Sequence, residues 1–189
     1  MRKIVLFMHT SLDGFVARPM GEMDWIHVND EMFDFADRQT QDADLAIYGR
    51  RTYNMMESYW PTAADNPRAT KHDIVHSAWY RSVDKIVFST TLEHSNSPFT
   101  QIRSEFNPQE IQDLKTKNGK NILMFGSPSI AHLLMQHNLI DEYWLFVNPI
   151  LLGKGIPLFS GSKQMTRLRL EQCTTLPSGV IGLQYVKRV

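Results

Sequence analysis

The stretch Asn121 to His137, NILMFGSPSIAHLLMQH, joins a short apolar run to the signals that start a helix. Ile122 to Phe125 is an apolar run between turn-forming residues, a pattern typical of a buried parallel strand. Gly126 can adopt backbone angles that other residues avoid, Ser127 is a good N-cap, and Pro128 suits the first helical position because it lacks an N–H. The stretch therefore predicts a strand that runs directly into a helix.

The start of this helix is a candidate phosphate site. Ile130, Leu133 and Leu134 follow the spacing of one buried helix face, and Asn138 is a suitable stop. A strand that ends on glycine and turns at once into a helix leaves free N–H groups pointing at one place, with the positive end of the helix dipole behind them. The alternative is a tight turn in an ordinary βα unit.

Composition predicts one soluble domain over residues 1–189, because 42% of the residues are hydrophobic and 21% are charged. Lys plus Arg and Asp plus Glu both number 20, so a net charge of +0 gives no electrostatic reason to expect nucleic acid or an anionic membrane as a partner. No window approaches the roughly 20 apolar residues of a membrane helix. The single cysteine, Cys173, forms no internal disulfide and suits the cytoplasm.

Apolar runs alternate with helical patterns along most of the chain. Strands are predicted at Lys3 to Met8, Ala43 to Tyr48, Lys85 to Phe88, Ile122 to Phe125 and Tyr143 to Leu152, and a hairpin from Arg167 to Val189. Pro61 to Arg81 is polar and is predicted to be a long connection with a helical C-terminal part. The pattern predicts an α/β fold of three layers, in which a mostly parallel central sheet has helices on both faces and an antiparallel C-terminal hairpin.

Three of the predicted strands end in small, hydroxyl or basic residues, and the carboxyl ends of parallel strands share one edge of a sheet. The three segments are Gly49-Arg50-Arg51-Thr52-Tyr53, Ser89-Thr90-Thr91 and Gly126-Ser127-Pro128-Ser129. Together they offer helix starts for phosphates, arginines for charge and hydroxyls for a ribose or its phosphate, which describes a dinucleotide site. The alternative is that the arginines only solvate a helix end, and the chain lacks the G-x-G-x-x-G motif.

His72 and His76 are four residues apart, as two ligands on a zinc-binding helix would be. The sequence shows no third ligand to accompany them. We therefore expect no metal site.

The order of these motifs resembles the dihydrofolate-reductase-like superfamily, and more closely a stand-alone bacterial branch related to the C-terminal reductase domain of the bifunctional riboflavin-biosynthesis deaminase/reductase. The resemblance covers nearly the whole chain. Its most specific parts are the Asp13-Gly14 turn in SLDGFVA and the segment Asp141 to Phe159, DEYWLFVNPILLGKGIPLF. It implies a homodimer that uses NADPH to reduce a carbon–nitrogen or carbonyl bond in a pteridine-like or pyrimidine-like small molecule.

The resemblance also implies which residues bind NADPH. The segment after the second predicted strand would hold the cofactor's phosphates. The segment after the third strand would hold its 2′-phosphate end, and the segment after the fourth strand would hold its pyrophosphate. The residues are Gly49, Arg50, Arg51, Thr52, Ser89, Thr90, Gly126, Ser127, Ser129 and Ile130. Dihydrofolate reductases carry two adjacent glycines at the fourth strand end, joined by a cis peptide bond, and Ser127 replaces the second of them here.

Two carboxylates are candidate catalytic groups, because reduction of a carbon–nitrogen double bond leaves a nitrogen that needs a proton. Asp30 follows Trp25 by five residues, the offset at which dihydrofolate reductases place their substrate carboxylate, although this position also suits a helix cap. Asp13 belongs to the S-L-D-G motif at a strand end, although Asp before Gly is also common in turns.

The rival hypothesis is a non-catalytic nucleotide-binding or regulatory module that retains the fold.

Overall fold

The computed structural model describes residues 1–26, 28–160 and 165–188. Its strands are β1 Ile4–Ser11, β2 Phe15–Ala17, β3 Ala43–Gly49, β4 Asp84–Phe88, β5 Thr100–Arg103, β6 Asn121–Phe125, β7 Glu142–Asn148, β8 Ile156–Pro157, β9 Leu168–Thr175 and β10 Ile181–Lys187. Its helices are α1 Asp30–Gln41, α2 Arg50–Glu57, α3 Trp60–Ala63, α4 Lys71–Ser82, α5 Pro108–Thr116 and α6 Pro128–Gln136.

An eight-stranded sheet with the order β5-β4-β3-β6-β1-β7-β10-β9 forms the middle layer. The strands from β5 to β7 are mutually parallel, whereas β10 pairs antiparallel with both β7 and β9. The short strands β2 and β8 form a second, two-stranded sheet. This architecture confirms the predicted α/β fold, with its mostly parallel sheet and its C-terminal hairpin.

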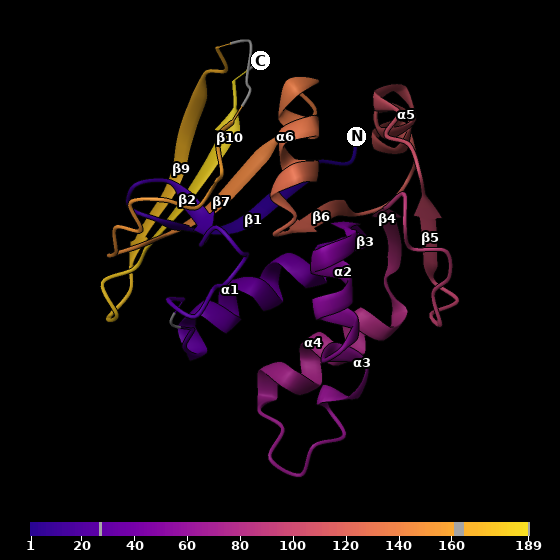
Figure 1. The fold of residues 1–189 in the computed structure, drawn as a ribbon, viewed down its shortest axis with the longest axis horizontal. Coiled ribbons are helices and arrows are strands. Elements are labelled where there is room, and N and C mark those ends of the chain that lie inside the picture. Colours follow the sequence, from indigo (N-terminus) through magenta and orange to yellow (C-terminus); the bar gives the residue numbers. More distant parts are fainter. Residues whose placement is uncertain (27, 161–164, 189) are drawn as a thin grey trace.

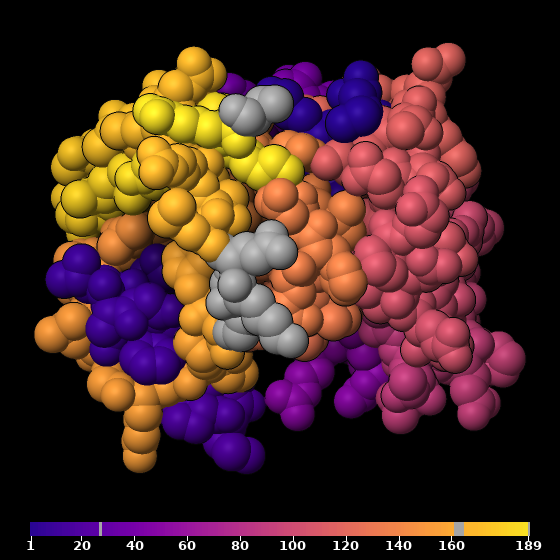
Figure 2. All heavy atoms as spheres, turned by 90° about the horizontal axis from the view of Figure 1, so that it is seen from above, coloured from indigo at the N-terminus to yellow at the C-terminus, as the bar shows by residue number. Residues whose placement is uncertain are grey.

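Helices cover both faces of the sheet, α5 and α6 on one side and α1 to α4 on the other (Figure 1). The strands supply both cores because their side chains alternate. In β1, Ile4 and Leu6 pack into the core that includes Leu134 of α6, while Val5 and Phe7 pack into the core beneath α1 and α2. Seen from above, α6 (orange) lies between the C-terminal strands (yellow) and the α5 region (salmon) (Figure 2).

Several local features differ from the sequence prediction. Strand β5 was missed because Thr100–Arg103 contains one apolar residue and pairs only with β4, at the edge of the sheet. The single-turn helix α3, which includes Pro61, was also missed. Strand β7 ends at Asn148 rather than Leu152, because Pro149 has no N–H for a ladder and the N–H of Ile150 turns back to the carbonyl of Asn148 at 2.8 Å. Within the described ranges, every helix is too short or too polar to cross a membrane.

Candidate functional site

Helices α2 and α6 begin side by side, because the strands that lead into them, β3 and β6, are neighbours in the sheet. The N–H of Gly49 donates a hydrogen bond to Oγ of Ser127 at 2.9 Å. In return, the N–H of Ser127 donates to Oγ1 of Thr52 at 3.1 Å. Each helix start therefore holds the other in place across the edge of the sheet.

This interlock explains why the predicted capping role of the Ser127 side chain is wrong. Ser127 occupies the N-cap position of α6, but its φ of 59° and ψ of 58° are left-handed and its side chain makes no capping bond to its own helix. Gly126 before it has a φ of 57°, so the turn needs two consecutive residues in a region that favours glycine. The bond between the two residues is trans.

The start of α6 has fewer free N–H groups than the sequence analysis expected. Pro128 has none, and those of Ile130 and Ala131 both reach the carbonyl oxygen of Ser127 at 2.9 Å. The N–H of Ser129 has no partner in the described part of the chain. The first turn of α2 adds further N–H groups, because Gly49 at its N-cap offers no side-chain acceptor. An anion would thus be bound by both helix starts together.

A cavity of about 1150 Å³ opens at this edge, larger than the roughly 300–1,000 Å³ of a typical small-molecule pocket. All ten predicted cofactor-binding residues line it. We call these lining segments the polar wall: residues 49–52, 89–91 and 126–130. The structure therefore brings together the three strand-end motifs that the sequence placed at one edge.

The polar wall suits a dinucleotide phosphate group. The side chains of Arg50 and Arg51 are exposed at the cavity and bring positive charge to it. A Cβ atom added to Gly49 would lie 3.3 Å from Cγ1 of Ile130, so glycine keeps the approach between the helix starts narrow and backbone-lined. Ser89 Oγ accepts hydrogen bonds from the N–H groups of Thr91 and Leu92, at 3.1 and 2.8 Å. Its hydroxyl proton remains available to a ligand.

A second group of lining residues is mainly apolar and comes from α1, α2, α4 and the segments around them. We call it the apolar wall: Met23, Ile26, Val28, Met32, Phe33, Ala36, Met55, Met56, Trp60, His72, His76 and Phe125. Such a surface favours a flat ring, because aromatic faces stack on one another and exclude water.

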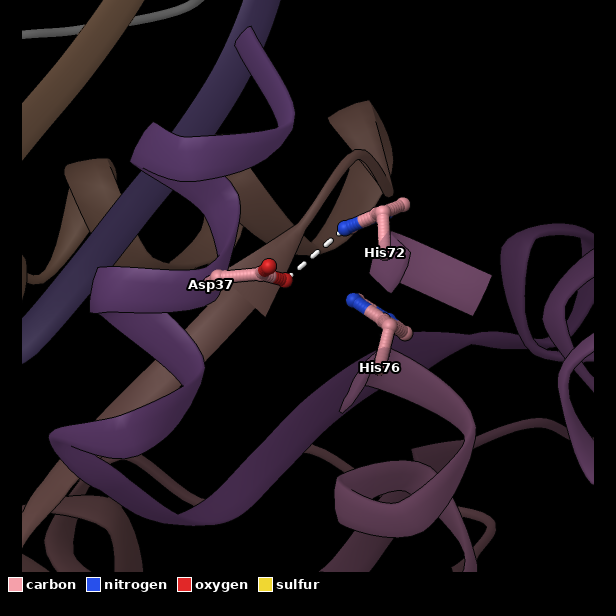
Figure 3. A group of neighbouring side chains, drawn as sticks. All are labelled: Asp37, His72 and His76. Atoms are coloured by element: carbon pink, nitrogen blue, oxygen red, sulfur yellow. Dashed lines mark hydrogen bonds and ion pairs between the residues drawn. The ribbon is translucent and has the colours of Figure 1, made fainter. Parts of the chain in front are cut away.

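Two histidines of the apolar wall lie next to a carboxylate, that of Asp37 (Figure 3). Nδ1 of His72 and Oδ1 of Asp37 are hydrogen-bonded at 2.8 Å, from α4 and α1 respectively. One turn further along α4, both ring nitrogens of His76 are buried and lack a partner among the described residues. Burial lowers the pKa of His76 to about 3, so its ring is neutral at physiological pH. The spacing of the two histidines is visible in the sequence, but their contact with Asp37 is not, because Asp37 precedes His72 by 35 residues.

His9 is a further cavity residue that sequence reasoning missed. The strand predicted at Lys3 to Met8 extends to Ser11 as β1 and carries His9 to the cavity. Its ring stacks on Phe146 with centroids 5.4 Å apart, and its Nδ1 is buried without a partner in the described ranges. Burial lowers the pKa of His9 to about 4. A buried polar nitrogen at a cavity is well placed to bond a ligand.

The structure does not bring Asp13 to the cavity. Its exposed carboxylate accepts hydrogen bonds from Oγ of Ser11 at 2.6 Å and from the N–H groups of Leu152 and Gly153 at 3.1 and 2.8 Å. The Ser11 hydrogen bond is the largest cause that holds the pKa of Asp13 below its usual value. Asp13 thus ties the turn after β1 to the segment after β7.

Asp30 also lies outside the lining of the cavity. It is the first residue of α1 and is exposed to solvent. The cap of this helix is Asn29, whose side chain accepts from the N–H of Met32 at 3.0 Å. Asp30 is therefore in the first helical turn, where a carboxylate interacts favourably with the helix dipole.

Comparisons with known proteins identify the family. The model of the RibD C-terminal domain matches residues 2–182. The Bacillus subtilis protein YyaP is 32% identical over 186 residues, which cover 97% of this chain and 94% of that protein. Among solved structures, a protein of Shewanella sp. PV-4 named for riboflavin biosynthesis is 23% identical, with a TM-score of 0.73 and 99% of each chain covered.

The fold also recurs inside a larger enzyme. The diaminohydroxyphosphoribosylaminopyrimidine deaminase/5-amino-6-(5-phosphoribosylamino)uracil reductase of Thermotoga maritima is 15% identical, with a TM-score of 0.66. The alignment covers 99% of this chain and 57% of that one. These matches confirm the resemblance found in the sequence, and the chain belongs to the RibD C-terminal domain family.

Proposed function

We propose that this protein is an NADPH-dependent reductase of a pyrimidine-like or pteridine-like small molecule. Membership of the RibD C-terminal domain family supports reductase chemistry. The observation that carries the proposal is the junction of α2 and α6, where two interlocked helix starts and two arginines line one cavity. This combination of backbone donors and positive charge is what a pyrophosphate needs.

The residues of the polar wall would share the binding of NADPH. The N–H of Ser129 and the first turn of α2 would hold the pyrophosphate, with Arg50 and Arg51 neutralising its charge. The hydroxyls of Ser89 and Thr90 would donate to the 2′-phosphate. When bound, the nicotinamide supplies a hydride to the substrate.

The apolar wall would hold the substrate. A pyrimidine or pteridine ring is flat, and the wall offers the aromatic side chains of Phe33, Trp60 and Phe125. The Thermotoga maritima protein is named as a reductase of 5-amino-6-(5-phosphoribosylamino)uracil, which contains a pyrimidine ring. We assign no proton-transfer step to Asp13 or Asp30, because both lie outside the cavity lining.

The proposal includes a homodimer, which is a family expectation, and a cytoplasmic location, which rests on the cysteine content. The exposed thiol of Cys173 fits a reducing compartment. Size-exclusion chromatography with light scattering tests the dimer directly, and a monomeric mass would remove that part of the proposal without touching the chemistry.

Fluorescence titration with NADPH and NADH, followed by assays of NADPH oxidation, tests the function. We expect NADPH to bind more than about tenfold tighter than NADH, since one charge-assisted hydrogen bond to the 2′-phosphate contributes roughly 1.5–3 kcal/mol. The candidate substrates are dihydrofolate, dihydropterins and 5-amino-6-(5-phosphoribosylamino)uracil. Oxidation with any of them supports the reductase. Binding of NADPH without oxidation supports the rival, a nucleotide-binding module, and equal affinity for both cofactors contradicts the NADPH assignment.

A further inference from the structure

We propose that Asp37, His72 and His76 form a binding site for one divalent transition-metal ion of the zinc class, at the two histidines of the apolar wall. Each of the three residues offers one ligand atom, and these atoms all lie within 4.8 Å of one another. Two nitrogens and one carboxylate oxygen are a common protein ligand set for such an ion. The site does not depend on the proposed reductase activity.

The three side chains converge because of the helices that carry them (Figure 3). His72 and His76 are one turn apart on α4, which brings both rings to the same face of that helix. Asp37 comes from α1, which packs against α4, and its side chain points toward both rings. This is the third ligand that the sequence did not reveal.

The distances are close to those that an ion requires. Zinc bonds of about 2.0–2.1 Å in a tetrahedral site put the ligand atoms roughly 3.4 Å apart. Asp37 and His72 are already 2.8 Å apart in their hydrogen bond, and the ion would replace the proton that they share. The ligand atom of His76 lies within 4.8 Å of the other two, so binding an ion requires it to approach them by at most about 1.4 Å.

The unpaired nitrogens of His76 are the second, independent observation. A buried imidazole without a hydrogen bond destabilises the protein, since each buried unsatisfied group costs about 1–3 kcal/mol. His76 is 2% exposed, and both of its ring nitrogens are without a partner in the described ranges. The large majority of buried polar side-chain atoms in proteins have a hydrogen-bond partner, so the unpaired state of both nitrogens points to a ligand.

Neighbouring aromatic side chains hold the two histidine rings in place, and the ligand atoms determine the class of ion. The ring of Phe33 stacks on His72 with centroids 4.0 Å apart, and the ring of Trp60 lies 3.9 Å from that of His76. Imidazole nitrogens suit zinc, cobalt, nickel or iron, whereas magnesium and calcium need more oxygen ligands than this cluster offers. Both histidines line the cavity, so a fourth ligand, a water or a bound molecule, would come from that side.

The alternative role for these histidines is proton donation to a substrate. That role needs a charged imidazole at neutral pH, and the burial of His76 keeps its ring uncharged. The neutral form is the one that binds a metal.

Titration of the chelator-treated full-length protein with zinc chloride, by isothermal calorimetry, tests the site. We expect one zinc ion per chain and a rise in the melting temperature, because the ion binds only the folded form. The visible absorption of cobalt(II) reports the geometry of the same site. A wild-type protein that binds neither zinc nor cobalt overturns the proposal.

Three variants locate the ion. His76→Ala should weaken zinc binding by about 100-fold or more, since even loss of a group that only orients a ligand costs about 10- to 100-fold. Asp37→Asn keeps the shape and the hydrogen bond to His72 but loses the anionic ligand, so it should also weaken binding while the protein stays folded. His94→Ala, at an exposed loop position, is the matched control and should bind zinc as the wild type does. Equal zinc binding by wild type, His76→Ala and Asp37→Asn would place the ion elsewhere and overturn the proposal.

Discussion

The two walls of the cavity differ in how their residues come together. In the polar wall, each segment lies directly after a strand, and the parallel sheet alone brings the three strand ends to one edge. At the apolar wall, the two histidines meet Asp37 only because α1 packs on α4. A site built at strand ends can therefore be recognised from local sequence signals, whereas a site built between helix faces depends on tertiary packing.

The largest expected effect is on the polar wall. Gly126→Val should weaken NADPH binding by about 100-fold or more, because a β-branched residue is strained at a φ of 57° and its side chain would fill the approach to the helix starts. A Cβ atom there would lie 3.4 Å from Cγ2 of Thr52. Fluorescence titration measures the affinity, and circular dichroism confirms that the variant is folded.

Gly153→Val is the matched control for this prediction. Gly153 also has a positive φ, 70°, but a Cβ atom there meets nothing within 4 Å and the residue lies outside the cavity lining. This variant should carry similar backbone strain and bind NADPH normally. Equal losses in both variants would mean that strain alone, and not the place of Gly126, determines the result.

The same contrast explains what the sequence could predict. The strand β6 and the helix α6 were predictable because the apolar run, the glycine and the proline are contiguous in the sequence. The left-handed backbone of Ser127 and its hydrogen bond to Gly49 were not predictable. Those two features depend on the neighbouring helix start. The roles of Asp37 and His9 escaped prediction because they depend on which helix packs where and on how far β1 extends.

A smaller effect concerns the hydrogen bonds that interlock the starts of α2 and α6 in the polar wall. Ser127→Ala should lower the free energy of unfolding by about 1–3 kcal/mol, because the buried N–H of Gly49 loses its acceptor. Ser129→Ala, two residues later and exposed, should leave stability within about 0.5 kcal/mol of the wild type. Urea unfolding measures both. A stable Ser127→Ala variant would show that the interlock contributes little to the fold.

His9 should make the stability of the folded protein depend on pH. The pKa of His9 is lowered from 6.5 to about 4 in the folded protein, so between these values the unfolded chain binds a proton that the folded one does not. Stability should therefore fall as the pH drops from 6.5 toward 4. His9→Phe should remove about 1.5 kcal/mol of this loss between pH 6.5 and 5, whereas the exposed control His94→Phe should not. Identical pH profiles for wild type and His9→Phe would contradict the burial of His9.

The smallest expected effect concerns the two carboxylates outside the cavity. Asp30→Asn should change turnover by less than about twofold and the free energy of unfolding by no more than about 0.5 kcal/mol. Asn29 already caps α1, and the side chain of residue 30 is exposed. Asp13→Asn should act only on stability, since its carboxylate joins two loops. Steady-state assays with an identified substrate measure turnover, and NADPH titration serves as the control. A loss of about 100-fold in turnover with unchanged NADPH affinity, the usual size of a general-acid contribution, would show instead that the carboxylate reaches the substrate when the cavity is filled.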